Sequence, residues 1–344
     1  MLFPTEVLRS KCFENGDYHF EGKPMLDTDF GTTEWLALAA QFRDRWGDPT
    51  AGGSIVEQRE RARRLADTLA GATAVAPTPA CRIHEIEIDA DTLGTYARLY
   101  EPLDRSDAVP TQLFLHGGGF IHGSPRELVN ESMLSWRAVR TGVRIVSLAY
   151  ALAPEHPFPA ARNQTIRALA ELRARASELR IDIDRLGLGG NSAGASIAAS
   201  ATLELARSGG PNLHHLALEV PAVSLRGLHE LLADAQQAQR DEIDALLQAY
   251  RPDTDGAAFA ADAADLEGFP PTLIVAAEHD PLRQGAALLA ERLRATGVDV
   301  AEHVVPGTLH GSPGITRSST SAQRWQSLVD GALLRAYGTE ETLR

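Results

Sequence analysis

Two glycine-rich strings hold the residues of this chain with the clearest potential for chemistry. Residues 190–194 read Gly-Asn-Ser-Ala-Gly. This fits the G-x-S-x-G pattern, in which a sharp turn between a strand and a helix exposes a serine hydroxyl at the top of a parallel sheet. The flanking residues are small because a larger side chain would collide in so tight a turn. The pattern therefore predicts Ser192 as a nucleophile.

The other string lies upstream, where residues 116–120 read His-Gly-Gly-Gly-Phe. A glycine has no Cβ, so its backbone amide can closely approach an oxygen that is becoming negatively charged. The HGGG pattern predicts an oxyanion hole, and its presence makes a chance match at Ser192 much less credible. His116 itself is expected to brace the loop, because no HExxH motif or Cys/His cluster accompanies it as a metal site would require.

The elements around both strings favour this interpretation. The short apolar run 185–189 predicts a buried strand before Ser192, and residues 193–207 are rich in helix formers and end at two glycines. Residues 111–115 predict a strand before the HGGG string. Both strings then lie at the carboxyl ends of strands, where open α/β sheets place their sites.

A nucleophilic serine needs a general base, which follows it in the chain order Ser, Asp or Glu, His. Two downstream histidines compete for this role. His303 lies in a run that alternates like a strand, which favours a role in the sheet. His310 follows a Pro306-Gly307 turn, in a loop that can carry it over the sheet edge. We predict His310 as the base.

The carboxylate that orients the base is expected just after the strand 272–277. Asp280 stands past the end of that strand, whereas Glu278 is closer to it and is expected to cap or pair locally. Asp280 also precedes Pro281 and fits an N-cap of the helix that follows. The catalytic and capping roles are compatible, and we predict Asp280 as the acid.

Taken together, these motifs resemble the hormone-sensitive lipase family of α/β-hydrolases, in its bacterial carboxylesterase branch. The matching segments are HGGGF at 116–120, YALAPEHPFPA at 150–160, GNSAG at 190–194, ADLEGFPPT at 264–272, EHDPLR at 278–283 and PGTLHG at 306–311. The resemblance implies the α/β-hydrolase fold, a mostly parallel eight-stranded sheet with helices on both faces and a helical cap.

The resemblance also implies the residues of the site. The family's catalytic triad falls on Ser192, Asp280 and His310, and its oxyanion donors fall on the amides of Gly118, Gly119 and Ala193. No metal or organic cofactor is implied. The expected reaction is hydrolysis of small to medium uncharged acyl esters through an acyl-enzyme. A lactonase, an amidase, an acyltransferase and a non-catalytic ligand-binding protein on this fold remain as alternatives.

The chain departs from the family around the triad. Asn191 stands where the family usually has an acid, and Ser312 stands where an aromatic residue usually follows the base. The latter suggests that Ser312→Phe narrows the substrate preference toward short acyl chains. The expected substrate-binding residues are Phe120, Asn191 and Trp46.

The domain organisation is expected to be simple. Residues 1–76 are expected to form an N-terminal helical cap segment, and residues 77–344 the α/β-hydrolase core with a helical cap insertion at about 221–262. Helices are expected at 34–46 and 55–69, and Trp35, Phe42 and Trp46 share one helix face as candidate roof residues. Strands are expected at 83–88, 95–100, 112–115, 143–149, 185–189, 216–220, 272–277 and 300–305.

Composition limits the partners. The formal net charge of −13 disfavours nucleic acids and anionic membranes, which bind clustered Lys and Arg. Only Cys12 and Cys81 are present, which is no disulfide framework and favours a reducing compartment. The first residues lack the basic start and apolar run of a secretory signal, and no run approaches the ~18 apolar residues of a membrane span. We expect a cytoplasmic enzyme whose partner is a small-molecule ester, and a homodimer is compatible with the sequence.

Overall fold

The computed structural model describes residues 30–46, 51–88, 95–103, 108–225, 228, 237–252 and 257–339. Its centre is an eight-stranded sheet in the order β1-β2-β4-β3-β5-β6-β7-β8. The strands are β1 (Cys81–Ile88), β2 (Thr95–Pro102), β3 (Val109–Leu115), β4 (Arg144–Leu148), β5 (Ile181–Asn191), β6 (Leu216–Glu219), β7 (Thr272–Ala277) and β8 (Val300–Val305).

Strand direction explains where the site forms. β2 runs antiparallel to both β1 and β4, and every pair from β4 to β8 is parallel. In the register of β3 with β5, Leu115 pairs with Gly190. The two glycine-rich strings therefore leave the sheet side by side, at its carboxyl edge.

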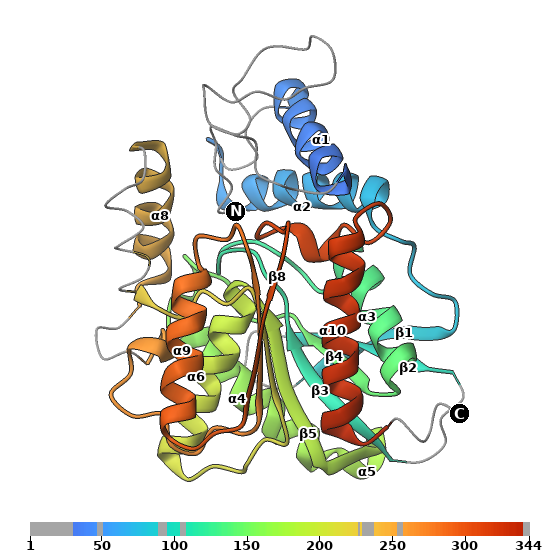
Figure 1. Cartoon of the computed structure of the whole chain (residues 1–344), viewed down its shortest axis with the longest axis vertical. Helices are drawn as coiled ribbons and strands as arrows, with labels where there is room; N and C mark the ends of the chain where they lie inside the picture. The colour runs from blue at the N-terminus through green and yellow to red at the C-terminus, as the bar shows by residue number, and fades with distance from the viewer. Residues whose placement is uncertain are drawn as a thin grey trace.

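Helices cover both faces of the sheet (Figure 1). Because side chains alternate along a strand, Leu113 packs with α4 (Ala160–Ala174), α6 (Ala193–Ser208) and α9 (Arg283–Ala295), while Phe114 packs with α3 (Leu128–Thr141) and α10 (Thr320–Tyr337). The short helix α5 (Ala176–Leu179) precedes β5. The expected fold class, an eight-stranded and mostly parallel sheet with helices on both faces, is confirmed.

At the top of Figure 1, α2 (Ile55–Thr73) crosses the carboxyl edge of the sheet, and α1 (Phe30–Trp46) lies above α2. A third, α8 (Gln237–Tyr250), stands beside them. Trp35 of α1 and Leu65 of α2 share a small apolar cluster with Ile315 of the core. The described chain also contains two short 3-10 helices, η1 (Ala260–Asp262) and η2 (Ser312–Gly314).

One arginine attaches α2 to the core beside the HGGG string. Arg59 donates from Nε to the carbonyl of Ile121 at 2.8 Å and from Nη2 to the carbonyl of Ala153 at 2.9 Å. Its guanidinium also makes a bidentate pair with Glu155, at 2.8 and 2.7 Å. These contacts hold helix α2 over the loop that begins with the HGGG string.

The element boundaries differ modestly from those expected. The eight expected strands are all present, but β5 begins at Ile181, which pairs in register with Val109 of β3. Helix α1 begins at Phe30 and α2 continues to Thr73. Residues 1–29, 47–50, 226–227 and 229–236 lie outside the described part of the chain, so the proposed cap boundaries stay a prediction. No described helix is both long and apolar enough to cross a membrane.

Candidate active site

Ser192 occupies a strained turn between β5 and α6. Its backbone has φ 54° and ψ −119°, a region that residues with a Cβ rarely adopt. The neighbouring glycines make the turn feasible. A Cβ on Gly190 would lie 2.5 Å from the backbone carbon of Gly194, and a Cβ on Gly194 would lie 2.1 Å from the carbonyl oxygen of Leu115. The turn therefore packs directly onto the end of β3.

The three residues expected as a triad form one hydrogen-bonded chain. Ser192 Oγ lies 2.8 Å from His310 Nε2, and His310 Nδ1 lies 2.7 Å from Asp280 Oδ2. The Asp280 side chain is 1% exposed, so its interaction with the imidazole is little screened by water. In this arrangement His310 can accept the serine proton while Asp280 holds the ring and stabilises its charged form.

Hydrogen bonds between two loops bring Asp280 and His310 together. The amide of His279 donates to the carbonyl of Thr308 at 3.0 Å, and the amide of Gly307 donates to Glu278 Oε2 at 2.9 Å. The loop after β7 is thereby fastened to the loop after β8. Glu278 pairs locally, as the sequence suggested.

His303 has a place in the sheet, and Asp280 closes a turn and does not cap a helix. His303 lies within β8 and pairs in register with Val275. Asp280 does not act as the N-cap of a helix that begins at Pro281, because α9 begins at Arg283 and Leu282 is its cap residue. Instead, Asp280 Oδ1 accepts the amide of Leu282 at 2.9 Å and closes the turn before the helix. Its other oxygen stays available to His310.

The expected oxyanion donors lie beside Ser192. Among the described residues, the amides of Gly118, Gly119 and Ala193 have no hydrogen-bond acceptor. Gly118 has φ 129°, and a Cβ there would lie 2.1 Å from the carbonyl oxygen of His122. A Cβ on Gly117 would lie 3.4 Å from the Cβ of Ser192, so the loop packs against the nucleophile. All three residues line the same cavity as Ser192, so their amides stay the predicted oxyanion donors.

His116 braces this loop, as expected. Its Nδ1 lies 2.7 Å from the carbonyl of Gly117, and its ring stacks on Tyr150 with centroids 4.3 Å apart. The Tyr150 hydroxyl donates to the carbonyl of His116 at 2.8 Å. Burial lowers the pKa of His116 to about 4, so the ring is neutral and its Nδ1–H donates. Groups of three or more side chains able to hold a metal ion are absent from the described residues.

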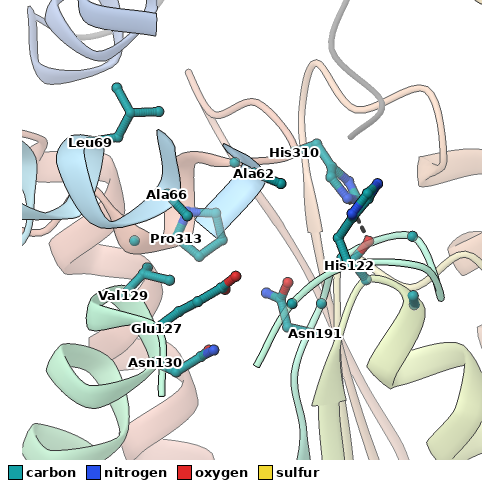
Figure 2. Close-up of a pocket in the computed structure, with 18 of the residues that line it drawn as sticks. Ala62, Ala66, Leu69, His122, Glu127, Val129, Asn130, Asn191, His310 and Pro313 are labelled. Atoms are coloured by element: carbon teal, nitrogen blue, oxygen red, sulfur yellow. Dashed lines mark hydrogen bonds between the residues drawn. The ribbon is translucent and has the colours of Figure 1, made fainter. Parts of the chain in front are cut away.

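Ser192 opens into a cavity of about 210 Å³. We call one part of its lining the α3 side, which consists of Glu127, Val129, Asn130 and Met133. We call another part the α8 side, which consists of Leu228, Ile243 and Leu246. Helix α2 contributes Ala62, Ala66 and Leu69, which lie over the cavity in Figure 2. The α3 side carries polar groups and the α8 side is apolar.

The expected substrate-binding residues have different positions. Asn191 lines the cavity and, in the view of Figure 2, lies to the right of Glu127 and below His310 and His122. Phe120 also lines it but is 3% exposed, because its ring stacks on Tyr250 with centroids 3.8 Å apart. The side chain of Trp46 lies outside the described part of the chain. Of the other roof candidates, Trp35 lines the cavity, whereas Phe42 packs against the apolar cluster between α1, α2 and the core.

Ser312 is not among the residues that line the cavity, so the position assumed for it was wrong, and the effect of Ser312→Phe on acyl-chain preference stays a prediction. The residue is fully buried, and its Oγ accepts the amide of Leu309 at 2.9 Å. It braces the loop that carries His310, and a phenylalanine would disrupt that loop. The cavity is instead lined at this point by Pro313, Gly314 and Ile315.

Comparison with known proteins agrees with this geometry. A family model described as the alpha/beta hydrolase fold matches residues 112–313. This chain belongs to the α/β-hydrolase family. Among its relatives is Carboxylesterase NlhH of Mycobacterium tuberculosis strain H37Rv, 36% identical over 275 residues that cover 76% of this chain and 83% of the relative. Esterase LipI of the same strain is 33% identical over 250 residues, 69% of this chain and 76% of LipI.

A solved structure extends the likeness over nearly the whole α/β-hydrolase chain. The ester-hydrolase EH1AB1 from the metagenome of Lake Arreo superimposes with a TM-score of 0.79 at 26% identity, covering 92% of this chain and all 100% of that one. The resemblance to the hormone-sensitive lipase-like branch is confirmed by these relatives.

Proposed function

We propose that this α/β-hydrolase is a serine carboxylesterase, with Ser192 as nucleophile, His310 as general base and Asp280 as the residue that orients the base. The observation that carries the proposal is the unbroken chain from Ser192 Oγ through His310 to Asp280, at 2.8 and 2.7 Å, beside three amides without acceptors. The names of the relatives, a carboxylesterase, an esterase and an ester-hydrolase, support the reaction class.

The proposed reaction proceeds in two halves. As the Ser192 hydroxyl attacks the ester carbonyl, His310 Nε2 takes its proton, and it then gives that proton to the departing alcohol. Water next attacks the acyl-enzyme with His310 as base, and release of the acid restores Ser192. In both halves the carbonyl oxygen is expected to lie among the amides of Gly118, Gly119 and Ala193. Each such donor is worth roughly 3 kcal/mol of the barrier.

We further propose that residues 1–76 and about 221–262 form a cap that selects the substrate. Helices α2 and α8, one from each segment, both contribute to the lining of the cavity. The volume of about 210 Å³ is below the roughly 300–1,000 Å³ typical of sites for drug-sized ligands, which favours small to medium esters. The apolar α8 side, with Phe120, suits an uncharged acyl group.

A substrate panel separates the remaining alternatives. Lactones, amides and acyl transfer to other acceptors pass through the same acyl-enzyme, so the triad does not distinguish them. Chromogenic esters of increasing acyl length, run beside lactones and aryl amides, decide the class. Cytoplasmic location and a homodimer stay predictions.

The decisive test is Ser192→Ala. The change removes one hydroxyl that borders the cavity, so we expect the fold to persist and hydrolysis to fall by several orders of magnitude. Steady-state kinetics with a short-chain ester measures the loss, and circular dichroism checks the fold. Activity within tenfold of the wild type overturns the proposal.

A matched pair of histidine variants tests the base. His310→Ala is expected to abolish turnover, whereas His303→Ala, within β8, is expected to change stability and leave most of the activity. If His303→Ala is the inactive variant, the assignment of the base fails. Asp280→Asn is expected to cost up to about 10⁴ in kcat by leaving the imidazole poorly oriented.

A further inference from the structure

Glu127 places a carboxyl group in the catalytic cavity without a partner. The residue directly precedes α3, is partly buried, and points toward Asn191 across the cavity (Figure 2). Among the described residues, no hydrogen bond or ion pair reaches its carboxyl group. Buried carboxyl groups normally find a partner, because an unpaired one loses the hydration that stabilises it in water. It is not among the site residues expected from the sequence.

The position of Glu127 does not explain its acidic side chain. It is the N-cap residue of α3, where a side chain usually accepts a hydrogen bond from the first helical turn, but its own makes none. Asp67 of α2 performs that task, since its Oδ1 accepts the amide of Leu128 at 2.9 Å. The carboxyl group of Glu127 is thus available to a ligand that enters the cavity.

The cavity around Glu127 favours positive charge. No lysine or arginine of the described residues lines it. Burial lowers the pKa of His122, which does line it, to about 4, so this ring is neutral near pH 7. Among the described residues, the cation that acts on Glu127 is Arg63 of α2, which already pairs with Glu60 and Asp67, at 3.3 and 3.5 Å. Trp35 adds an aromatic ring to the lining, a surface to which ammonium groups bind.

We propose that Glu127 is a specificity residue that binds a cationic nitrogen in the alcohol portion of the substrate, so that the enzyme prefers esters of amino alcohols to neutral esters of the same shape. This inference rests on the proposed esterase function. The apolar α8 side takes the uncharged acyl group, which leaves the α3 side, with Glu127 and Asn130, for the alcohol.

The preference is expected to depend on pH in a definite direction. Burial, reinforced by the negative charge of Asp67 and opposed by Arg63, raises the pKa of Glu127 to about 8. Besides Asp67 and Arg63, the described titratable groups that interact with it or share its cavity are Tyr150, His122 and His310. The carboxylate form pairs with a cation, so the preference for a permanently charged substrate rises as the pH passes from 7 to 9. The kcat/KM for neutral esters is not expected to increase as Glu127 ionises.

A pair of isosteric esters tests the proposal on the full-length chain. Butyrylcholine carries a quaternary ammonium, and 3,3-dimethylbutyl butyrate replaces that nitrogen with carbon. We expect the ratio of their kcat/KM values to favour butyrylcholine at least tenfold at pH 8.5, about 1.4 kcal/mol, and to fall to near one in Glu127→Gln. The control is Glu131→Gln, one turn along α3, whose carboxylate pairs with Arg98 at 2.8 Å and does not line the cavity. Its ratio is expected to match the wild type.

The outcomes separate the two proposals. If the folded wild type hydrolyses neither ester nor any short-chain ester, the esterase function itself fails. If it hydrolyses both with a ratio near one, or if Glu127→Gln keeps the wild-type ratio, only the role of Glu127 is overturned. A Glu127-dependent preference confined to esters with the ammonium in the acyl group overturns its assignment to the alcohol.

A binding measurement keeps the proposal testable if Glu127→Gln does not fold. In the wild type, choline is expected to inhibit hydrolysis of a neutral ester at least tenfold more strongly than 3,3-dimethylbutanol, and more strongly at pH 9 than at pH 7. Equal inhibition by the two alcohols refutes the cation site.

Discussion

Two desolvated glutamates near the carboxyl edge of the sheet have opposite surroundings. Glu219, at the end of β6, is 1% exposed and pairs with Arg137 at 2.7 Å. Its other carboxylate oxygen accepts Trp325 Nε1 at 2.8 Å. Glu127, which lines the catalytic cavity, has no partner for its carboxyl group among the described residues. The carboxylate of Glu219 is thus paired within the protein, whereas the carboxyl group of Glu127 is unpaired among the described residues.

The difference separates a structural carboxylate from one that is available to a ligand. Glu219 also fixes the nucleophile turn through its backbone, because its carbonyl accepts the amide of Ser192 at 2.8 Å. Both carboxylate oxygens of Glu219 accept a hydrogen bond, and removal of one partner of a buried ion pair is costly. An unpaired carboxyl group reduces stability and is therefore informative about function.

The largest expected effect is that of Glu219→Gln. This variant leaves Arg137 buried without its counter-charge, and the loss of one partner of a buried pair costs about 3 to 5 kcal/mol. We expect a decrease of this order in the free energy of unfolding, measured by urea denaturation, and a lower kcat because Ser192 is held through β6. A change below about 1 kcal/mol contradicts the structural role of Glu219.

The double variant Arg137→Met with Glu219→Gln sharpens this test. Removing both charges avoids the unpaired ion, so the double variant is expected to be more stable than Glu219→Gln alone, by about 2 kcal/mol. Additive losses from the two single variants would show that the ion pair is not the source of the cost.

A smaller effect of opposite sign is expected at Glu127. Its pKa is raised from 4.5 to about 8 in the fold, so the folded state keeps a proton that the unfolded chain releases between these values. The wild type therefore loses stability relative to Glu127→Gln as the pH rises from about 4.5 to about 8, and the difference then levels off. Because water can enter the cavity, we expect roughly 1 to 3 kcal/mol. Unfolding curves of both proteins from pH 5 to pH 9 measure it, and a constant difference contradicts the raised pKa.

The smallest effect is expected for Glu131→Gln. Its pair with Arg98 is partly exposed, and such pairs contribute about 0 to 1 kcal/mol. Its unfolding free energy is expected to stay within that range of the wild type at every pH from 5 to 9. A larger loss would mean that changes along α3 disturb the helix as a whole, and the Glu127 comparison would then need a different control.

Much of the site could be predicted because its motifs reflect local geometry. The turn at Ser192 needs glycines at positions 190 and 194, and the loop of Gly118 needs a positive φ, so both requirements are visible in the sequence. The choice of His310 over His303 followed from the difference between a loop and an alternating strand, and the structure places them accordingly. The roles of these residues stay predictions until they are tested.

The errors concern residues whose environment is made by distant segments. Ser312 follows His310 in the chain and was expected in the pocket, yet it is buried beneath the loop with its Oγ on the amide of Leu309. No motif in the sequence points to Glu127. Only the capping of α3 by Asp67, which is far away in the sequence, shows that its carboxyl group is unused.

The sequence by itself determined the order of strands and helices along the chain. It also determined the local backbone of the turn at Ser192, of the predicted oxyanion loop and of the loop that carries His310. These depend on periodicity and on where a Cβ fits, and both act over a few residues. Tertiary structure alone decided which of the two glutamates is paired, which residues line the cavity, and how the loops after β7 and β8 bring Asp280 to His310. Burial and pairing are properties of the assembled chain, because they depend on what the other segments place around each charge.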